Sequence, residues 1–131
     1  MILFFDEDMG VAIPKFLRGA EEGVDVLWLR ARFPNETDPR RQDVGWLEEA
    51  GRNRWLVISC NKSMLDVVFE RQAVLEHRVG IVFLASGKIG RLVMMRAILN
   101  KWDWLKAVDS TEPRPFVHYL YARGVTRQIG L

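Results

Sequence analysis

The chain has 131 residues, of which 49% are hydrophobic and 27% charged, and a formal net charge of only +2; this composition is typical of a globular domain and excludes a disordered or collagen-like chain. No apolar run reaches the ~18 residues of a membrane span, the N-terminal apolar run is too short for a signal peptide, and the single cysteine excludes an internal disulfide. We therefore expect one domain over residues 1–131 that works in the cytoplasm and has no membrane partner.

Unbroken apolar runs alternate with helical patterns along the chain. In chain order, we expect a strand over 1–5, a helix over 11–22, a strand over 24–29, a helix from residue 43, a strand over 55–60, a helix over 64–77, a strand over 79–84, a helix over 92–108 and a strand over 116–121. Residues 31–42 are expected to form a polar loop, and residues 122–131 a short basic tail. This alternation predicts an α/β fold with a mainly parallel sheet of five strands and helices on both faces.

Polar residues follow two of the expected buried strands. Asp6, Glu7 and Asp8 come directly after the first strand, and Asn61 follows the third. Because ligands of open α/β sheets bind outside the carboxyl ends of the strands, we expect these side chains at a functional site, together with Asp43 at the start of a helix. Crowded carboxylates repel one another unless a cation lies among them, and hard oxygen ligands suit Mg²⁺ or Mn²⁺. The sequence therefore points to a small metal-dependent enzyme.

The acidic residues also have structural interpretations. Asp8 and Asp43 could each be the N-cap of the helix that follows, and Glu7 could point to solvent. Asp6 is the hardest to explain structurally, because a carboxylate at the end of a buried strand needs a partner. Two carboxylates that share a divalent cation can orient a water for attack on a phosphodiester. On the functional interpretation, Asp6, Asp43 and Asp8 are the catalytic candidates.

Basic residues flank the expected acidic site. Arginine outnumbers lysine by fourteen to five in the chain; Arg32, Arg40 and Arg41 lie in the loop over 31–42, and Lys62 follows the third strand. Guanidinium groups can bind phosphate through two parallel hydrogen bonds, so these four residues are candidates for contact with a nucleic-acid backbone. The alternative is an ordinary solvated loop.

Three short motifs occur in order at these positions: Phe5-Asp6-Glu7-Asp8, Asp43-Val-Gly-Trp-Leu and Leu56-Val-Ile-Ser-Cys-Asn61-Lys62. With them the chain resembles PIN-like domains and, more narrowly, the small VapC-toxin-like PIN ribonucleases. The resemblance implies a Rossmann-like α/β/α sandwich that cleaves RNA with Mg²⁺ or Mn²⁺, a cognate antitoxin protein as partner, and often a homodimer. Carried over by position, it makes Asp6 the principal metal ligand and Asp43 the second acid, with Glu7 and Asp8 as weaker matches.

Asn61 departs from the family pattern, which usually carries Asp at this step, whereas Ser59 keeps the hydroxyl group found two residues earlier. An amide oxygen can still bind a hard cation, but it brings no charge and cannot act as a base. Two hypotheses follow. The chain is a metal-dependent endoribonuclease, the toxin of a toxin–antitoxin pair, or it is a PIN-like domain that has lost catalysis and binds protein or nucleic acid.

Overall fold

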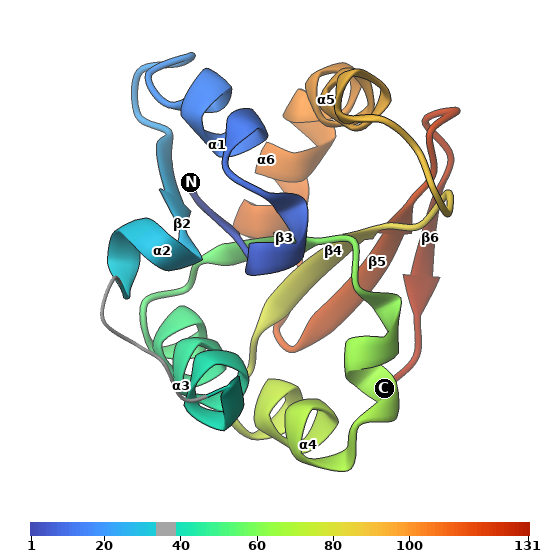
Figure 1. The fold of residues 1–131 in the computed structure, drawn as a ribbon. Helices are drawn as coiled ribbons and strands as arrows, with labels where there is room; N and C mark the ends of the chain where they lie inside the picture. Colours follow the sequence, from blue (N-terminus) through green and yellow to red (C-terminus); the bar gives the residue numbers. More distant parts are fainter. Residues whose placement is uncertain (34–38) are drawn as a thin grey trace.

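The sheet is the central layer of the molecule (Figure 1). The computed structural model describes residues 1–33 and 39–131, except for the side chains of residues 39–44. Within these residues the sheet has six strands, in the order β2-β1-β3-β4-β5-β6. Their bounds are β1 (Ile2–Phe5), β2 (Asp25–Trp28), β3 (Leu56–Ser59), β4 (Gly80–Leu84), β5 (Phe116–Leu120) and β6 (Thr126–Ile129). All neighbours pair in parallel except β6, which is antiparallel to β5.

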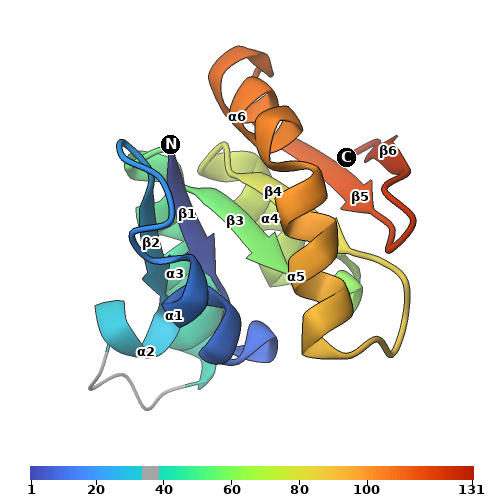
Figure 2. The same cartoon turned by 90° about the horizontal axis from the view of Figure 1, so that it is seen from above.

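Helices cover both faces of the sheet. The helices are α1 (Ala12–Leu17), α2 (Leu29–Arg32), α3 (Pro39–Arg52), α4 (Val68–Glu76), α5 (Arg91–Asn100) and α6 (Trp102–Thr111), with 3₁₀ turns η1 (Glu7–Met9) and η2 (Lys62–Asp66). Seen from above, α1, α5 and α6 lie on one side of the sheet and α3 and α4 on the other (Figure 2). These three layers confirm the predicted α/β/α sandwich. In the described part of the chain, no helix is both long and apolar enough to cross a membrane.

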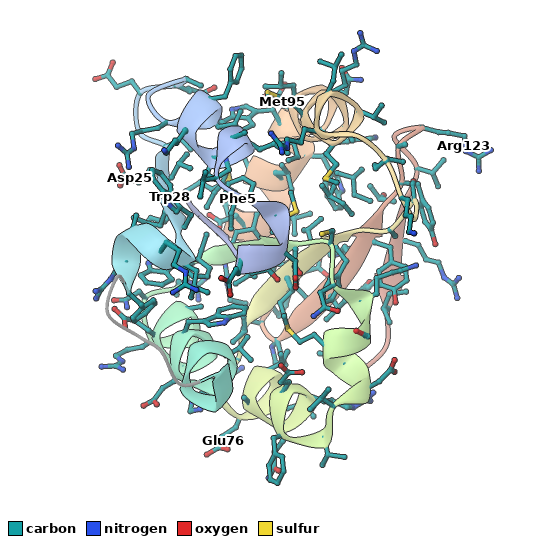
Figure 3. The ribbon with its side chains drawn as sticks, viewed as in Figure 1. Phe5, Asp25, Trp28, Glu76, Met95 and Arg123 are labelled. Atoms are coloured by element: carbon teal, nitrogen blue, oxygen red, sulfur yellow. The ribbon has the colours of Figure 1, made fainter. Side chains whose placement is uncertain are left out.

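The first strand lies in the middle of the core. Leu3, Phe4 and Phe5 are fully buried, because β1 has a strand on each side and a helical layer over each face. Phe5 packs with the cluster under α1, α5 and α6 and lies inside the molecule (Figure 3). Phe4 points the other way and stacks on Trp46 and Trp55, with ring centroids 5.2 and 5.1 Å away. Burial on both faces explains why this strand is an unbroken apolar run.

The prediction of five strands was wrong, because the expected C-terminal tail forms β6. A tight turn joins β5 to β6: the Tyr121 N–H donates to the Val125 oxygen at 2.9 Å, and Gly124 adopts a φ of 86°. Leu120 then pairs with Thr126, and Val117 with Ile129. The sequence Thr-Arg-Gln-Ile has no apolar run, since an antiparallel edge strand has only one buried face and partly polar residues suffice there.

Several helix boundaries also differ from the prediction. The first helix ends at Leu17, and the helix expected over 64–77 begins only at Val68, after η2. Helix α3 begins at Pro39 rather than Asp43. Proline at the first helical position has a preset backbone and lacks an N–H that would have no partner there. The helix expected over 92–108 is broken at Lys101 into α5 and α6. The break lets buried residues from both helices join the same cluster against the sheet.

Candidate functional site

The candidate site lies where β1 and β3 end side by side. From β1 the chain crosses to β2 on one side, and β3 later pairs with the other side of β1. Such a change of direction opens a crevice at the carboxyl ends of the strands, which is where α/β sheets bind ligands. Phe5 pairs with Ile58 in the parallel register, so the next residues, Asp6 and Ser59, leave the two strands as neighbours. The strand order thus positions Asp6 at this crevice.

Asp6 is a buried carboxylate with one bound and one unbound oxygen. Only 4% of the residue is exposed. The Ser59 hydroxyl donates a hydrogen bond to Oδ2 at 2.5 Å, whereas Oδ1 has no hydrogen-bond partner among the described residues. Its main chain is fixed as well, because the Asp6 N–H donates to the Ile58 oxygen at 3.3 Å and the Met9 N–H to the Asp6 oxygen at 3.2 Å. A buried oxygen with no partner is costly, and it can bind a cation.

The surroundings of Asp6 disfavour its negative charge. The pKa of Asp6 is raised from 3.8 to about 7, mainly by burial and to a smaller extent by the neighbouring charge of Asp8, whereas the hydrogen bond from Ser59 lowers it. The metal-free protein therefore holds this carboxyl partly protonated near neutral pH. A divalent cation beside Oδ1 would stabilise the charged form and displace the proton.

Glu7 and Asp8 are exposed on η1, immediately beyond Asp6. Glu7 accepts a hydrogen bond from Arg30 Nη2 at 2.7 Å, an ion pair that links η1 to α2. Asp8 is close enough for its charge to act on Asp6. The N-cap of α1 is Val11, so the interpretation of Asp8 as a helix cap was wrong. Of these two acids, Asp8 is the one that shares the electrostatic environment of Asp6.

Asn61 is connected to Asp6 through a single hydroxyl group. Its N–H donates to Ser59 Oγ at 3.0 Å, and the same hydroxyl donates to Asp6. The side-chain oxygen of Asn61 accepts a hydrogen bond from Ser63 Oγ at 2.5 Å. Asn61 therefore lies at the site, but its amide oxygen already has a donor, and a cation would have to share that oxygen.

The basic candidates have different surroundings. Lys62 donates to the Ala85 oxygen at 3.3 Å and lies 5.7 Å from the ring centroid of Tyr119, so it is held at the carboxyl ends of β4 and β5. Arg32 is exposed and forms an ion pair with Glu49 of α3. Its guanidinium group also lies 5.2 Å from the ring of Phe33.

The remaining three site residues lie outside the described side chains: Arg40, Arg41 and Asp43. Their backbone belongs to α3, which begins at Pro39. Asp43 is therefore inside the helix and is not its N-cap, so this structural interpretation was wrong as well.

The oxygen donors at the crevice suit a hard cation, although they form an incomplete set. Over residues 1–33 and 45–131, no three His, Cys, Asp or Glu side chains are close enough to hold a metal ion together. Asp6 Oδ1 offers one unpartnered anionic ligand, Asp8 a second negative charge nearby and Asn61 a neutral oxygen. This donor chemistry fits Mg²⁺ or Mn²⁺.

Two features of the site were not anticipated from the sequence. The ion pair between Glu7 and Arg30 depends on β2 lying next to β1, and strand order cannot be read from a run of apolar residues. The ring of Tyr119 near Lys62 comes from β5, which is far away in the sequence but is the second strand from β3. Glu7 follows an expected strand and Tyr119 lies within one, and these positions were the only sign in the sequence that either residue lies near the site.

Comparison with known families agrees with this geometry. Residues 1–86 match the family model described as PIN like domain. The match contains β1 to β4 and both the Asp6 and Asn61 ends of the crevice. No curated protein and no solved structure matches the chain significantly. Because the family model covers well over half of the 131 residues, the chain belongs to the PIN-like domain family.

Proposed function

We propose that this protein is a metal-dependent endoribonuclease of the PIN-like type, acting as the toxin of a toxin–antitoxin pair. The observation that carries the proposal is the buried Asp6, whose Oδ1 has no hydrogen-bond partner in the described part of the chain, at the switch point of a PIN-like sheet. A structural carboxylate would have both oxygens hydrogen-bonded, and a ligand for a cation needs one oxygen without a donor. The substrate is single-stranded or loop RNA, where the backbone is accessible.

The residues of the crevice have distinct roles in this proposal. Bound Mg²⁺ or Mn²⁺ would stabilise the charge that develops on a phosphodiester and lower the pKa of an attacking water. Asp6 would hold the cation, while Ser59 fixes the carboxylate by donating to Oδ2. Asp8 would add negative charge beside Asp6, and Asn61 would contribute its amide oxygen. The role of Asp43 as the second acid is proposed from the family alone, since its side chain lies outside the described residues. Glu7 is the weakest ligand candidate, because Arg30 neutralises it.

The proposed partners are the RNA substrate, an antitoxin protein and a second copy of this chain. Lys62, Arg32, Arg40 and Arg41 are the proposed contacts to the RNA backbone, where cations position a strand without reading its sequence. A cognate antitoxin and a homodimer are proposed from the family alone. The cytoplasm is the proposed location, since RNA is the substrate.

The test is cleavage of a mixed RNA pool with Mn²⁺, with Mg²⁺ or with EDTA, for the wild type, Asp6→Asn and Asp25→Asn. Asp25 is an exposed acid at the amino end of β2, whereas the candidate site is at the carboxyl ends of the strands (Figure 3). It is therefore a matched control for the loss of one carboxylate. We expect cleavage that needs metal, disappears in Asp6→Asn and persists in Asp25→Asn. Metal-dependent cleavage by Asp6→Asn would overturn the assignment of Asp6.

The second candidate function is a PIN-like binding module without catalysis. Asn61 favours it, because the position carries no charge and its oxygen already accepts from Ser63. Calorimetric titration with Mn²⁺ separates the two candidates: the module has no affinity at millimolar Mn²⁺ and cuts no RNA. On the ribonuclease proposal, Asn61→Asp should bind Mn²⁺ at least tenfold more tightly than the wild type, since it adds a carboxylate beside Asp6.

A further inference from the structure

A polar pocket lies where the parallel strands of the sheet begin. It has a volume of about 410 Å³ and is lined by Gly51, Arg54, His77, Arg78 and Arg114. These residues directly precede three strands, β3, β4 and β5, so the pocket is at the amino ends of the strands. The candidate metal centre is at their carboxyl ends. The pocket is therefore separate from the site around Asp6.

Two of the arginines adopt a backbone conformation that normally requires glycine. Arg54 has a φ of 55° and Arg78 a φ of 57°, and they are the two non-glycine residues with positive φ in the described part of the chain. Each follows the end of a helix, α3 or α4, at the position where a left-handed glycine usually terminates it. The hydrogen bonds are those of that motif: Trp55 N–H to the Ala50 oxygen at 2.9 Å, and Val79 N–H to the Val74 oxygen at 3.1 Å.

Arginine at both positions calls for an explanation beyond the helix ends. Glycine would make the same turns without strain, and strained residues cluster at functional sites. Close packing brings the two turns together: a Cβ atom on Gly51 would lie 2.0 Å from the main-chain oxygen of His77. The ends of α3 and α4 therefore touch, and both arginines reach the same pocket.

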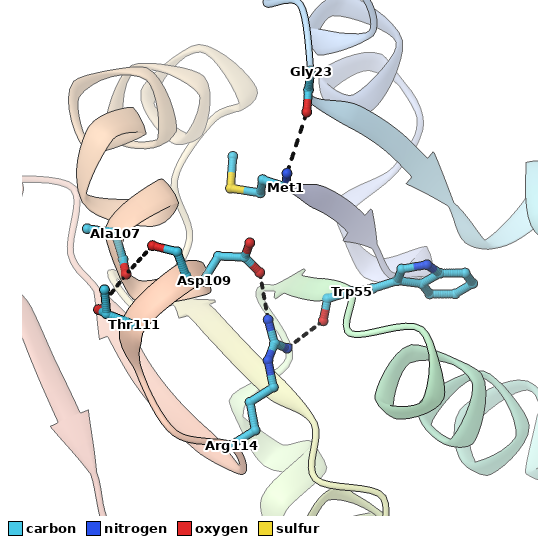
Figure 4. A network of polar contacts seen from close by, with 8 residues as sticks. Met1, Gly23, Trp55, Ala107, Asp109, Thr111 and Arg114 are labelled. Carbon is cyan, nitrogen blue, oxygen red and sulfur yellow. Dashed lines mark hydrogen bonds and ion pairs between the residues drawn. The ribbon is translucent and has the colours of Figure 1, made fainter.

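Arg114 supplies a third guanidinium group, and the side chain of this residue is only 3% exposed. Its Nη1 donates to the Trp55 oxygen at 2.9 Å and its Nη2 to Asp109 Oδ1 at 2.6 Å (Figure 4). Gly80 leaves room for it, since a Cβ atom there would lie 2.7 Å from Nη1. Its Nε has no hydrogen-bond partner among the described residues. A buried donor without an acceptor is costly, and this donor belongs to a residue that lines the pocket.

The positive charge of the pocket is only partly balanced. Asp109 offsets Arg114, but within the described residues neither Arg54 nor Arg78 has an acidic partner. Arg78 donates through Nε and Nη2 to the Arg114 oxygen at 3.3 and 3.2 Å, which adds no negative charge. Burial lowers the pKa of the Arg114 guanidinium and the nearby charge of Arg54 lowers it further, so the two cations are close. About two positive charges remain for a ligand.

We propose that this pocket binds the phosphate group of a phosphomonoester, either a free mononucleotide or the phosphorylated end of an RNA. A phosphomonoester carries roughly −1.5 to −2 charge near pH 7, which matches the uncompensated charge of Arg54 and Arg78. Planar guanidinium groups bind phosphate oxygens through paired hydrogen bonds. His77 also lines the pocket. A phosphodiester, with a single charge, would leave the pocket positively charged and bind less tightly.

The test is calorimetric titration in EDTA, so that no divalent cation can bridge phosphate to Asp6. The probes are inorganic phosphate, a nucleoside 5′-monophosphate, and one short RNA made with a 5′-phosphate and with a 5′-hydroxyl. The proteins are the wild type, Arg54→Gln, Arg54→Lys and Arg52→Gln. Arg52 is the matched control, because it is exposed on the same helix and pairs with Glu48 instead of lining the pocket.

We expect inorganic phosphate and at least one of the two monoester probes to bind the wild type and Arg52→Gln equally. Arg54→Gln should weaken this binding at least tenfold, and Arg54→Lys should restore part of it, since it keeps the charge without the planar fork. Binding of the mononucleotide alone identifies a free metabolite, and preference for the 5′-phosphorylated RNA identifies an RNA end. Failure of all phosphate probes to bind, or equal binding by Arg54→Gln and the wild type, would overturn the proposal. Asp6→Asn should bind phosphate normally, which separates this result from the ribonuclease test.

Discussion

The hydroxyl group of Ser59 on β3 donates to one carboxylate oxygen of Asp6, at the end of β1, and the other oxygen has no partner among the residues that the structure describes. The serine hydroxyl also accepts the N–H of Asn61. One side chain thus fixes the carboxylate and the turn after β3 in a single arrangement. Ser59 therefore contributes to the site from inside a buried strand, because its hydroxyl group orients the carboxylate of Asp6.

Replacement of Ser59 by alanine should raise the pKa of Asp6 by about one further pH unit or more, because the charged carboxylate loses its hydrogen bond. Carbon-13 NMR titration of the Asp6 carboxyl in metal-free protein measures this directly. Ser110→Ala is the control, since Ser110 is exposed near the end of α6 and its hydroxyl donates to the Ala107 oxygen of the same helix. An unchanged Asp6 pKa in Ser59→Ala would show that the hydrogen bond does not favour the charged form.

The stability of the metal-free protein should fall as pH rises toward neutrality. Asp6 ionises near pH 3.8 when unfolded and near 7 when folded, so the folded state binds more protons between these values. Its contribution to the free energy of unfolding is therefore greatest below pH 3.8, decreases with rising pH and levels off above 7, a loss of about 4 kcal/mol in total.

Urea denaturation in EDTA between pH 5 and 8 measures this dependence. Asp6→Asn has no charge to bury, so its stability should change much less over the same range, while the control Asp25→Asn should follow the wild type. A wild-type curve as flat as that of Asp6→Asn would mean that Asp6 ionises at similar pH in both states.

Much of this fold could be predicted from the sequence because its strands are buried on both faces. The run Ile2–Phe5 and the run Leu56–Ser59 have no polar residue facing solvent, and this signal is local. By contrast, β6 is an edge strand with two exposed residues, and its pairing depends on the turn at Gly124. The sequence could place Asp6 at the end of β1, but the pairing of β1 with β3 decides that Ser59 is its partner.

The pocket of arginines was not predicted for a similar reason. Arg54, Arg78 and Arg114 are at least 24 residues apart in sequence, and each looks like a surface cation after a helix or before a strand. They meet because the parallel strands β3, β4 and β5 all begin at the same edge. A left-handed backbone at arginine also leaves no mark in the sequence, since the pattern that indicates such a turn is glycine.

Alanine at two glycines of α3 should have opposite effects on stability. At Gly51 the new Cβ atom would meet the His77 main-chain oxygen at 2.0 Å, and neither backbone can yield easily, so we expect a loss of about 2 kcal/mol or more. At Gly45 no atom lies within 4 Å of the new Cβ, and alanine should stabilise the helix by roughly 0.5–1 kcal/mol. Chemical denaturation of both variants measures the difference; equal effects would contradict the contact between α3 and the end of α4.

Asp109→Asn should destabilise the protein by about 3 kcal/mol, because it leaves the buried guanidinium of Arg114 without its counter-charge. The side chain of Arg114 is 3% exposed and that of Asp109 18%, so water can replace the lost partner only in part. Asp103→Asn is the control, because Asp103 is an exposed acid on the same helix, α6. Urea denaturation of the two variants compares the largely buried Asp109 with an exposed acid. Since the loss of Asp109 also increases the positive charge around Arg114, Asp109→Asn should bind inorganic phosphate more tightly than the wild type, and weaker binding would contradict the role of Arg114 in the pocket.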